Sequence, residues 1–437
     1  MNADTSLLHL NPSQRHSVQS WLDVSGHSGP ISSNQSSTGL AFQRWFKFKE
    51  AFAPQLVLDV LQRASRKKRV SRCIDPFGGC GTTALTSQFV DVHPVLIEVN
   101  PFIADLAEAK LSSYDLDSLR NDFIAVRRAA TDDCADHLHL LEGAPATLCE
   151  PGNGSRWVFP REVLNRLLQY RVALESVRST RNRRLLRVLL ASIVVGVSNV
   201  TVNGKGRKYR GGWEARQKAP ASVDEAFRSA FLIALSDIAE FGDRAHNDYD
   251  LHRGSCLEKL SDVGDCDLAL FSPPYPNSFD YTDIYNLELW LLGYLKSKKD
   301  NHRLRNATLR SHVQLSGAHS FTPMPSECLC AALEELDAKR SQLWDDRIPE
   351  MIGAYFEDMG TLLWKMHSVV NPGGRVAVVI GDSSYAGVQV CASRITAEIA
   401  EAFGWKVERH VKLRSMRLSA QQGGEEQLEE RLLELVH

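Results

Sequence analysis

One glycine-rich turn constrains this chain more than any other feature of its sequence. Residues 74–83 read IDPFGGCGTT, which ends a short apolar strand candidate and leads into the helical stretch ALTSQFV. Glycine reaches backbone conformations that are closed to other residues, so a strand-to-helix turn with several glycines lets the backbone approach a ligand. The segment therefore predicts a βα unit with a binding site at its turn.

Strand candidates alternate with helical stretches along most of the chain. VSRCID near residue 72 is followed by PVLIEV near 96, DLALFS near 269 and VAVVIGD near 379, and the chain closes with WKVERHVKL and ERLLELVH. Alternating β and α segments favour an α/β fold with a largely parallel sheet. Because no helix separates the two closing strands, we expect them to form an antiparallel end of that sheet.

The length of the chain and two long insertions set the expected domain organisation. A chain of 437 residues exceeds the usual size of one domain, so one large core with insertions, or two domains, is expected. Residues 1–37 are polar and serine-rich and are expected to form a flexible tail before a folded domain over 38–437. A mostly helical insertion is expected over 111–248 and a second insertion over 295–350.

Composition argues against several classes of protein. No apolar run approaches the ~20 residues that a membrane span needs, and the N-terminus carries no export signal, so a cytoplasmic protein without a membrane partner is expected. The nine cysteines are scattered, and only Cys328 and Cys330 form a close pair, so we expect no disulfide framework and no metal site. The net charge of −2 does not by itself indicate a nucleic-acid-binding protein.

The residues around the glycine turn narrow the kind of ligand. Gly79 and Gly81 are followed by Thr82 and Thr83, so the third glycine of a nicotinamide-binding G-x-G-x-x-G loop is missing. Glu98 ends the next strand candidate, about one βαβ step further on, where a carboxylate can accept both hydroxyls of a ribose. A plain tight turn stays open as the alternative at this point.

The same segment resembles a motif of a known enzyme family. DPFGGCGTT is similar to the D-P-F-x-G-x-G-T-T motif of the DNA amino-methyltransferases, and IEVNP resembles their second motif. The resemblance implies S-adenosylmethionine as the cofactor. It also implies the cofactor-binding residues: Asp75, Gly79 and Gly81 around the amino-acid moiety, with Phe77, Thr82 and Thr83 of the same motif, Glu98 on the ribose and Val99 on the adenine face.

Two further segments resemble cofactor-binding parts of this family less closely. FKFKEAFAPQLVLDVL resembles the segment that closes over the methionine end of the cofactor, which makes Phe48 a candidate contact, and a core aromatic is the equal alternative. HRGSCLE resembles a third motif whose acid meets the adenine amino group. Ser255 replaces that acid here, so the contact at this position differs from the pattern.

A second constellation, FSPPY, follows the strand candidate DLAL directly. Two consecutive prolines end a strand and stiffen the backbone. An exocyclic amine on a base is a poor nucleophile, and two fixed hydrogen-bond acceptors draw electron density onto its nitrogen. Ser272 offers a side-chain acceptor and Pro273 a carbonyl held in place with Pro274, while Tyr275 offers a face for a base taken out of the stack. A rigid turn with a solvated tyrosine is the alternative.

SPPY resembles the catalytic motif of the amino-methyltransferases in its serine form, which favours cytosine N4 over adenine N6 as the target. The glycine motif precedes SPPY, as in the unpermuted class of this family. The family implies a Rossmann-like fold with a mostly parallel seven-stranded sheet and helices on both faces. A cytosine C5 enzyme is disfavoured because the chain contains no Pro-Cys dipeptide for a nucleophilic cysteine.

A basic segment within the helical insertion is the candidate nucleic-acid contact. Residues 203–218 interleave cations with aromatic side chains, which can bind phosphates and stack on bases. The residues expected to bind are Lys205, Arg207, Lys208, Tyr209, Arg210 and Trp213, on a loop that four glycines leave mobile. Residues 300–324, with Arg303, Arg305, Arg310, His312 and His319, are a second candidate for target recognition.

Taken together, the sequence predicts a methyltransferase that acts on a flipped base in double-stranded DNA. A cognate restriction or defence partner is an expected companion, and the oligomeric state is left open. An enzyme that modifies adenine N6 or an RNA base is the nearest alternative. A non-catalytic binding subunit predicts a damaged glycine turn or SPPY, and both are intact.

Overall fold

The computed structural model describes residues 10–23, 32–33, 37–203, 206–276, 280–315, 320–417 and 427–437. A seven-stranded sheet forms its centre, with strand order β10-β11-β7-β6-β1-β2-β5. The strands are β1 (Arg72–Asp75), β2 (His93–Glu98), β5 (Asp250–Arg253), β6 (Cys266–Phe271), β7 (Val370–Gly381), β10 (Lys406–Arg417) and β11 (Gln427–Val436).

The sheet is parallel except at one end. Strands β5, β2, β1, β6 and β7 pair in parallel, whereas β11 pairs antiparallel with both β7 and β10. The predicted α/β class, the parallel core and the antiparallel end are therefore confirmed. Strand β5 is the one strand of this sheet that the strand candidates did not include, because DLHR is short and carries two charges.

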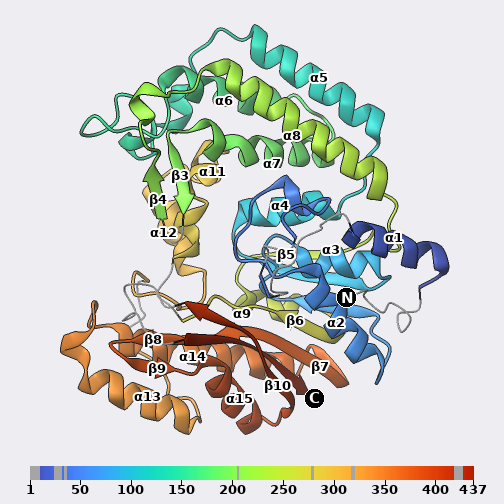
Figure 1. Ribbon diagram of the computed structural model, residues 1–437, viewed down its shortest axis with the longest axis vertical. Helices are drawn as coiled ribbons and strands as arrows, with labels where there is room; N and C mark the ends of the chain where they lie inside the picture. The colour runs from blue at the N-terminus through green and yellow to red at the C-terminus, as the bar shows by residue number, and fades with distance from the viewer. Residues whose placement is uncertain are drawn as a thin grey trace.

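Helices cover both faces of the sheet, as Figure 1 shows. Helices α2 (Pro54–Ser65), α3 (Thr82–Phe89) and α4 (Pro101–Leu111) pack on one face, and α9 (Cys256–Lys259), α14 (Ile348–Met366) and α15 (Ala392–Ala402) on the other. Successive residues of each strand enter opposite cores: Leu268 and Leu270 lie in the first, Ala269 and Phe271 in the second. This alternation follows from the two-residue period of a strand and requires apolar residues at nearly every position of β6.

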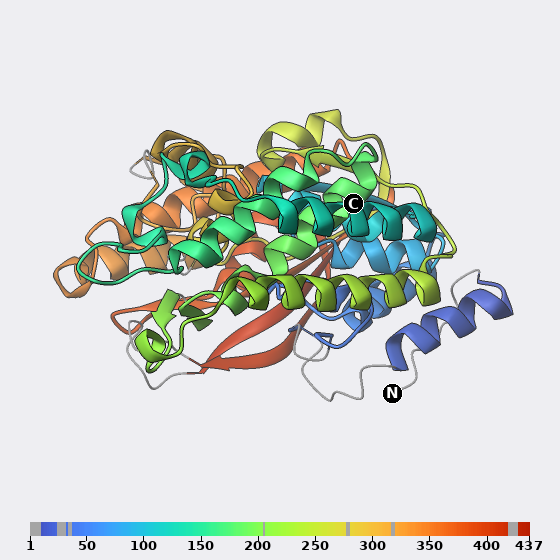
Figure 2. The same cartoon turned by 90° about the horizontal axis from the view of Figure 1, so that it is seen from above.

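A lobe of four long helices stands beside the sheet domain. Helices α5 (Leu116–Asp132), α6 (Arg161–Leu174), α7 (Thr180–Val197) and α8 (Pro220–Phe241) form this helical lobe, seen at the top of Figure 1 and facing the viewer in Figure 2. They fall within residues 111–248, the range expected for a mostly helical insertion. The lobe also carries a hairpin of β3 (Val200–Asn203) and β4 (Gly206–Tyr209).

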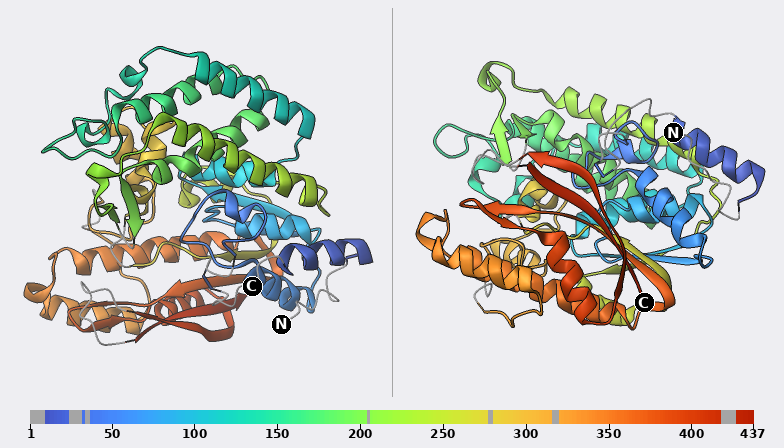
Figure 3. Two further views of the ribbon diagram at one scale, coloured as in Figure 1. Left: turned by 45° about the horizontal axis from the view of Figure 1, so that its top comes forward. Right: turned by 60° about the horizontal axis from the view of Figure 1, so that its bottom comes forward.

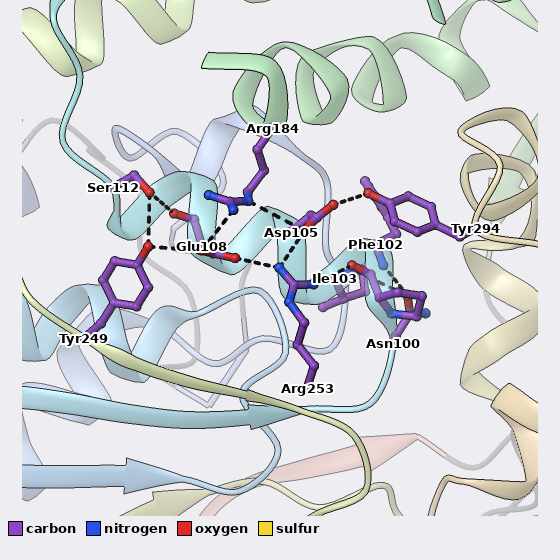
Figure 4. Close-up of polar contacts among 11 residues, drawn as sticks. Asn100, Phe102, Ile103, Asp105, Glu108, Ser112, Arg184, Tyr249, Arg253 and Tyr294 are labelled. Atoms are coloured by element: carbon purple, nitrogen blue, oxygen red, sulfur yellow. Dashed lines mark hydrogen bonds and ion pairs between the residues drawn. The ribbon is translucent and has the colours of Figure 1, made fainter. Parts of the chain in front are cut away.

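An ion-pair network fastens the helical lobe to the sheet domain (Figure 4). Arg184 of α7 lies 3.0 Å from Glu108 of α4, and Arg253 at the end of β5 lies 2.5 Å from the same carboxylate. Asp105, one turn earlier on α4, binds Arg253 and accepts a hydrogen bond from Tyr294. Two carboxylates on one face of α4 thus form ion pairs with arginines from two separate parts of the chain.

The remaining elements connect these layers. Figure 3 shows the long twisted strands β10 and β11 with α13 and α15 beside them. The other elements are α10 (Tyr281–Ile284), α11 (Asn286–Leu291), α12 (Lys298–Asn306), α13 (Glu327–Ala338), β8 (Ser383–Tyr385), β9 (Val388–Val390), and the short 3-10 helices η3 (Gln43–Trp45), η4 (Leu138–Leu141), η5 (Ala146–Leu148), η6 (Trp213–Ala215), η7 (Leu260–Asp262) and η8 (Arg340–Gln342). In the described part of the chain, no helix combines the length and apolar character needed to cross a membrane.

The structure corrects part of the expected flexible tail over 1–37, of which residues 1–9, 24–31 and 34–36 lie outside the described residues. Residues 12–23 form helix α1 (Pro12–Asp23), and Trp21 on this helix is fully buried. Its ring stacks on Phe89 at 4.1 Å between centroids, and its indole N–H donates to the Ala41 carbonyl at 3.2 Å. One aromatic anchor outweighs the polar composition of the segment, because burying a tryptophan removes a large apolar surface from water.

Candidate active site

A cavity of about 720 Å³ lies where the carboxyl ends of neighbouring strands meet. Strand β1 ends at Asp75 and its parallel neighbour β6 at Phe271, on opposite sides of the point where the strand order reverses. Ligands of open α/β sheets bind at such a point. The cavity wall includes thirteen of the fourteen residues expected at the cofactor or in catalysis: Phe48, Asp75, Phe77, Gly79, Thr82, Thr83, Glu98, Val99, Ser255, Ser272, Pro273, Pro274 and Tyr275.

The glycine turn is shaped by two left-handed backbone positions. Gly79 has φ +49°, and a Cβ there would lie 3.4 Å from the Phe48 ring. Gly81 has φ +80° and precedes helix α3, but it does not line the cavity. A Cβ on Gly81 would lie 3.0 Å from the Cβ of Ala107 on α4, so its lack of a side chain permits close helix packing. The expected contact of Gly81 with the cofactor stays a prediction.

Two buried carboxylates flank the turn. Asp75 accepts hydrogen bonds from the Thr83 hydroxyl at 2.7 Å and from the Phe77 backbone N–H at 3.0 Å. Glu98 accepts from the backbone N–H groups of Gly79 at 2.8 Å and Asn100 at 2.7 Å. Burial raises the pKa of each carboxyl to about 7, although these hydrogen bonds act in the opposite direction.

The segment before α2 forms the opposite wall of this part of the cavity. Phe48 stacks on Tyr285 with 5.3 Å between the ring centroids, and the Tyr285 hydroxyl donates to Glu50 at 2.5 Å. Asp237 of α8 anchors the start of the segment, because it accepts from the Trp45 indole and the Phe42 backbone N–H, each at 2.8 Å. The helical lobe therefore holds the segment that carries Phe48.

This wall fits the chemistry of S-adenosylmethionine. Carboxylates suit its ribose hydroxyls and ammonium group, and Phe48, Phe77, Val99 and Ile103 provide apolar surface for an adenine ring. A cavity of this size also leaves room for a second, planar ligand beside the cofactor.

The SPPY segment forms the other side of the cavity. Ser272 and Tyr275 are half-buried, and the Ser272 hydroxyl donates to the Tyr275 oxygen at 3.4 Å. The Tyr275 hydroxyl donates in turn to Glu430 of β11 at 2.7 Å. The carbonyl of Pro276, next to Tyr275, accepts from the buried Tyr385 hydroxyl at 2.9 Å, which holds the end of the proline turn.

The chain is similar to known methyltransferases over most of its length, although no family model matches it. It is 24% identical over 430 residues to the type II methyltransferase M.BsoBI of Geobacillus stearothermophilus, covering 86% of this chain and 80% of that protein. It is 26% identical over 417 residues to the type II methyltransferase M.AvaI of Nostoc sp., covering 87% and 82%. A 73-residue stretch is 36% identical to M.MjaII of Methanocaldococcus jannaschii, covering 17% and 13%.

The chain is therefore similar to type II methyltransferases over most of its length. Among solved structures, the rRNA methyltransferase aviRa from Streptomyces viridochromogenes aligns at 11% identity over 99% of this chain and 92% of that chain, with a TM-score of 0.29, a likeness too weak to inform the fold.

Several residues in the wall of the cavity were missed in the sequence. Glu50, Arg414 and Glu430 line the cavity, and Glu430 is only 1% exposed. A signal for Glu430 exists in the closing strand: Leu428, Glu430 and Leu432 share one face of β11, so a charged residue occupies a position otherwise filled by leucine. Glu50 carries no such periodic signal.

Residues 295–350, the second expected insertion, also contribute to the cavity. Thr308, Leu309 and the buried His312 line it. Arg305 is bound to Asp280 at 2.5 Å and Arg310 to Asp358 at 2.6 Å, so these two cations stabilise the insertion. The Arg303 side chain is 81% exposed, and His319 lies outside the described residues.

The basic segment forms a hairpin beside a segment that lines the cavity. Residues expected to be a mobile loop form strand β4, paired antiparallel with β3, and the hairpin extends from the helical lobe toward α12 in Figure 1. The Lys49 ammonium group, from the segment that lines the cavity, donates to the Val202 carbonyl at 3.1 Å. Arg207 and Lys208 are exposed, and Lys205 lies outside the described residues.

Two of the expected nucleic-acid contacts, Arg210 and Trp213, have partners within the protein. Arg210 donates to the carbonyls of Val195 at 2.9 Å and Ser198 at 3.2 Å, which satisfies the end of α7. Trp213 is 7% exposed and packs against Tyr209 and Trp157. Trp213 is thus too deeply buried to stack on a base, and its expected role is corrected to packing beneath the hairpin. Tyr209 is half-buried between Trp213 and the Arg156 guanidinium.

Proposed function

We propose that the protein transfers a methyl group from S-adenosylmethionine to the exocyclic amine of a flipped base in double-stranded DNA, with cytosine N4 as the target. One observation carries the proposal: the Asp75–Gly79–Glu98 wall and the Ser272–Tyr275 wall face one cavity. The similarity to relatives named type II methyltransferases supports methyl transfer, and we infer DNA as the substrate from the same names.

In this reaction the protein itself forms no covalent bond to the substrate, and its residues bind and orient the reactants. The bound cofactor supplies an electrophilic methyl group on a sulfonium. In the proposed mechanism, Glu98 would hold the ribose and Asp75 the charged amino-acid end of the cofactor. Ser272 and the Pro273 carbonyl would accept the two N–H groups of the amine, and Tyr275 would stack on the base. These acceptors would hold the amine nitrogen in place for methylation, and the proton that the nitrogen gives up would pass to solvent.

The exposed cations of the hairpin support binding of a duplex over the cavity. Arg207 and Lys208 lie on a strand that adjoins the cavity-lining segment through the Lys49–Val202 hydrogen bond. Lys47 is exposed and also lines the cavity. Cations near one opening would bind phosphates beside a flipped nucleotide. Pairing with a restriction or defence partner stays a prediction.

Methylation of matched DNA and RNA with labelled S-adenosylmethionine, followed by mass spectrometry of the nucleosides, tests the proposal. We expect N4-methylcytosine in DNA only. N6-methyladenine would keep the enzyme class but overturn the assigned base. Label in RNA alone would overturn the assigned substrate.

A further inference from the structure

We propose that Glu430, held by Arg414, is a positioning residue that fixes the hydroxyl of Ser272 as a hydrogen-bond acceptor toward the target amine, acting through Tyr275. The inference rests on the proposed function, because it assigns a role to the same SPPY wall. It adds two residues from the antiparallel end of the sheet to a site otherwise described by short local motifs.

Glu430 is a buried charge with a defined set of partners. Its Oε1 accepts from the Tyr275 hydroxyl at 2.7 Å, and its Oε2 accepts from Arg414 Nε at 2.7 Å. A second nitrogen of the same guanidinium lies 3.0 Å from Oε1. The side chain of Glu430 is 2% exposed and that of Arg414 is 30% exposed. The guanidinium compensates the buried carboxylate, since an isolated ion at this depth would be strongly disfavoured.

The donor and acceptor properties of these groups determine the direction of the hydrogen bonds. An ionised carboxylate can only accept, so the Tyr275 hydroxyl must point its hydrogen at Glu430. The Tyr275 oxygen then has only lone pairs to offer Ser272, whose hydroxyl donates to it at 3.4 Å. The Ser272 hydrogen is thereby directed along the wall. The lone pairs of the Ser272 oxygen are then available for an N–H group in the cavity.

This direction matters because the target amine is a hydrogen-bond donor. A serine hydroxyl rotates freely and can present either its hydrogen or a lone pair. Presenting the hydrogen would oppose an incoming N–H group, whereas a fixed lone pair accepts it without reorganisation during the reaction. The chain from Ser272 through Tyr275 to Glu430 removes the unfavourable orientation.

The packing around the Tyr275 ring is independent support for a fixed position. Gly381 ends strand β7, and a Cβ at this residue would lie 2.7 Å from the Tyr275 ring and 2.6 Å from the terminal methyl group of Met416 on β10. At these distances, only glycine fits at position 381 unless the Tyr275 ring and the Met416 side chain both move. The tyrosine is thus seated between the ends of β7 and β10, close to the carboxylate on β11 that it contacts.

Two variants test the chain, with a third as a matched control. Tyr275→Phe removes the hydroxyl but keeps the ring, and Glu430→Gln keeps the shape but lets an amide donate as well as accept. Glu434→Gln breaks a comparable ion pair on the same strand, where Glu434 binds Arg63 at 2.6 Å away from the cavity. Single-turnover methylation should slow by about 10- to 100-fold in Tyr275→Phe and in Glu430→Gln. It should be unchanged in Glu434→Gln.

The double variant distinguishes positioning from general weakening. If Glu430 acts through the Tyr275 hydroxyl, Tyr275→Phe/Glu430→Gln should be no slower than the slower single variant. Multiplied losses, or a full rate in Glu430→Gln, would overturn the proposal. Because Tyr275→Phe changes the shape of the protein very little, this arm remains informative even if the Glu430 variant folds poorly.

An NMR measurement tests the contact without relying on activity. In protein with ¹³C at the ring carbon that bears each tyrosine hydroxyl, the Tyr275 signal is the one lost in Tyr275→Phe. It should shift in Glu430→Gln and stay in place in Glu434→Gln, and an unmoved signal would overturn the proposal. A shift in a protein that methylates no DNA would instead refute the proposed function while leaving the contact intact.

Discussion

The two walls of the cavity are assembled in different ways. The proposed cofactor wall comes mainly from short contiguous segments, residues 48–52, 75–83 and 97–103, whose backbone shape we expect to provide much of the binding. The wall facing the target base combines the SPPY turn with Arg414 and Glu430, and Glu430 lies 155 residues from the tyrosine that it contacts. A cofactor common to many enzymes can be held by one local backbone shape, whereas the orientation of a particular base requires side chains from several strands.

The largest effect should come from the wall facing the base. Ser272→Ala removes an acceptor for the amine without altering the glycine turn, so single-turnover methylation should fall by about 100- to 1000-fold, the usual loss for one fixed polar group in a reaction site. Titration calorimetry should show cofactor affinity within about 2-fold of wild type. Full activity in this variant would contradict the separate roles proposed for the two walls.

The cofactor wall should show the opposite pattern. Gly79→Val places a branched side chain at φ +49°, against Phe48, and should weaken S-adenosylmethionine binding by at least about 100-fold. Gly154→Val is the control. Gly154 has φ +60° and no atom near its Cβ position, so this variant introduces the same kind of backbone strain without a steric contact. Comparable loss of binding in both variants would mean that strain, not the filled turn, is responsible.

The hairpin should affect DNA binding without affecting either wall. Replacing Arg207 and Lys208 by alanine should weaken DNA binding by about 10-fold and reduce the slope of log affinity against log salt by about 2, since each phosphate contact contributes about 0.9. Fluorescence anisotropy at several salt concentrations measures both. Arg210→Ala, whose guanidinium is bound to backbone carbonyls, should leave the slope unchanged.

The smallest expected effect is a pH dependence of cofactor binding. Burial raises the pKa of both Asp75 and Glu98 to about 7, above their unfolded values of about 4. These groups therefore stabilise the fold fully below about pH 4, and that contribution is lost as the pH rises through about 7.

A cofactor that donates hydrogen bonds and carries an ammonium group favours the ionised carboxylates. Binding should therefore release protons near pH 7, and affinity should rise by about 3-fold between pH 6 and 8. Calorimetry in two buffers of different ionisation enthalpy detects the protons, and Glu98→Gln should reduce their number. Identical heats in both buffers would show that these carboxyls do not change protonation on binding.

The sequence predicted the cofactor wall better than the wall facing the base, for a physical reason. Glycines, prolines and strand ends fix the local backbone, so DPFGGCGTT and SPPY each predict a turn of defined shape. The tail was mispredicted because the contact of Trp21 with Phe89 joins segments about 70 residues apart. Trp213 was mispredicted because aromaticity does not reveal whether a side chain is already packed within the protein.

The sequence by itself determined the alternation of strands and helices, the two turns and the residue types that they present. Only the tertiary structure decided that β1 and β6 are neighbours, that β11 lies between β7 and β10, and that Glu430 therefore meets Tyr275. Local conformation depends on neighbouring residues in the chain, but strand order and register depend on the burial of whole faces. Contacts across the sheet therefore become visible only once those faces are packed.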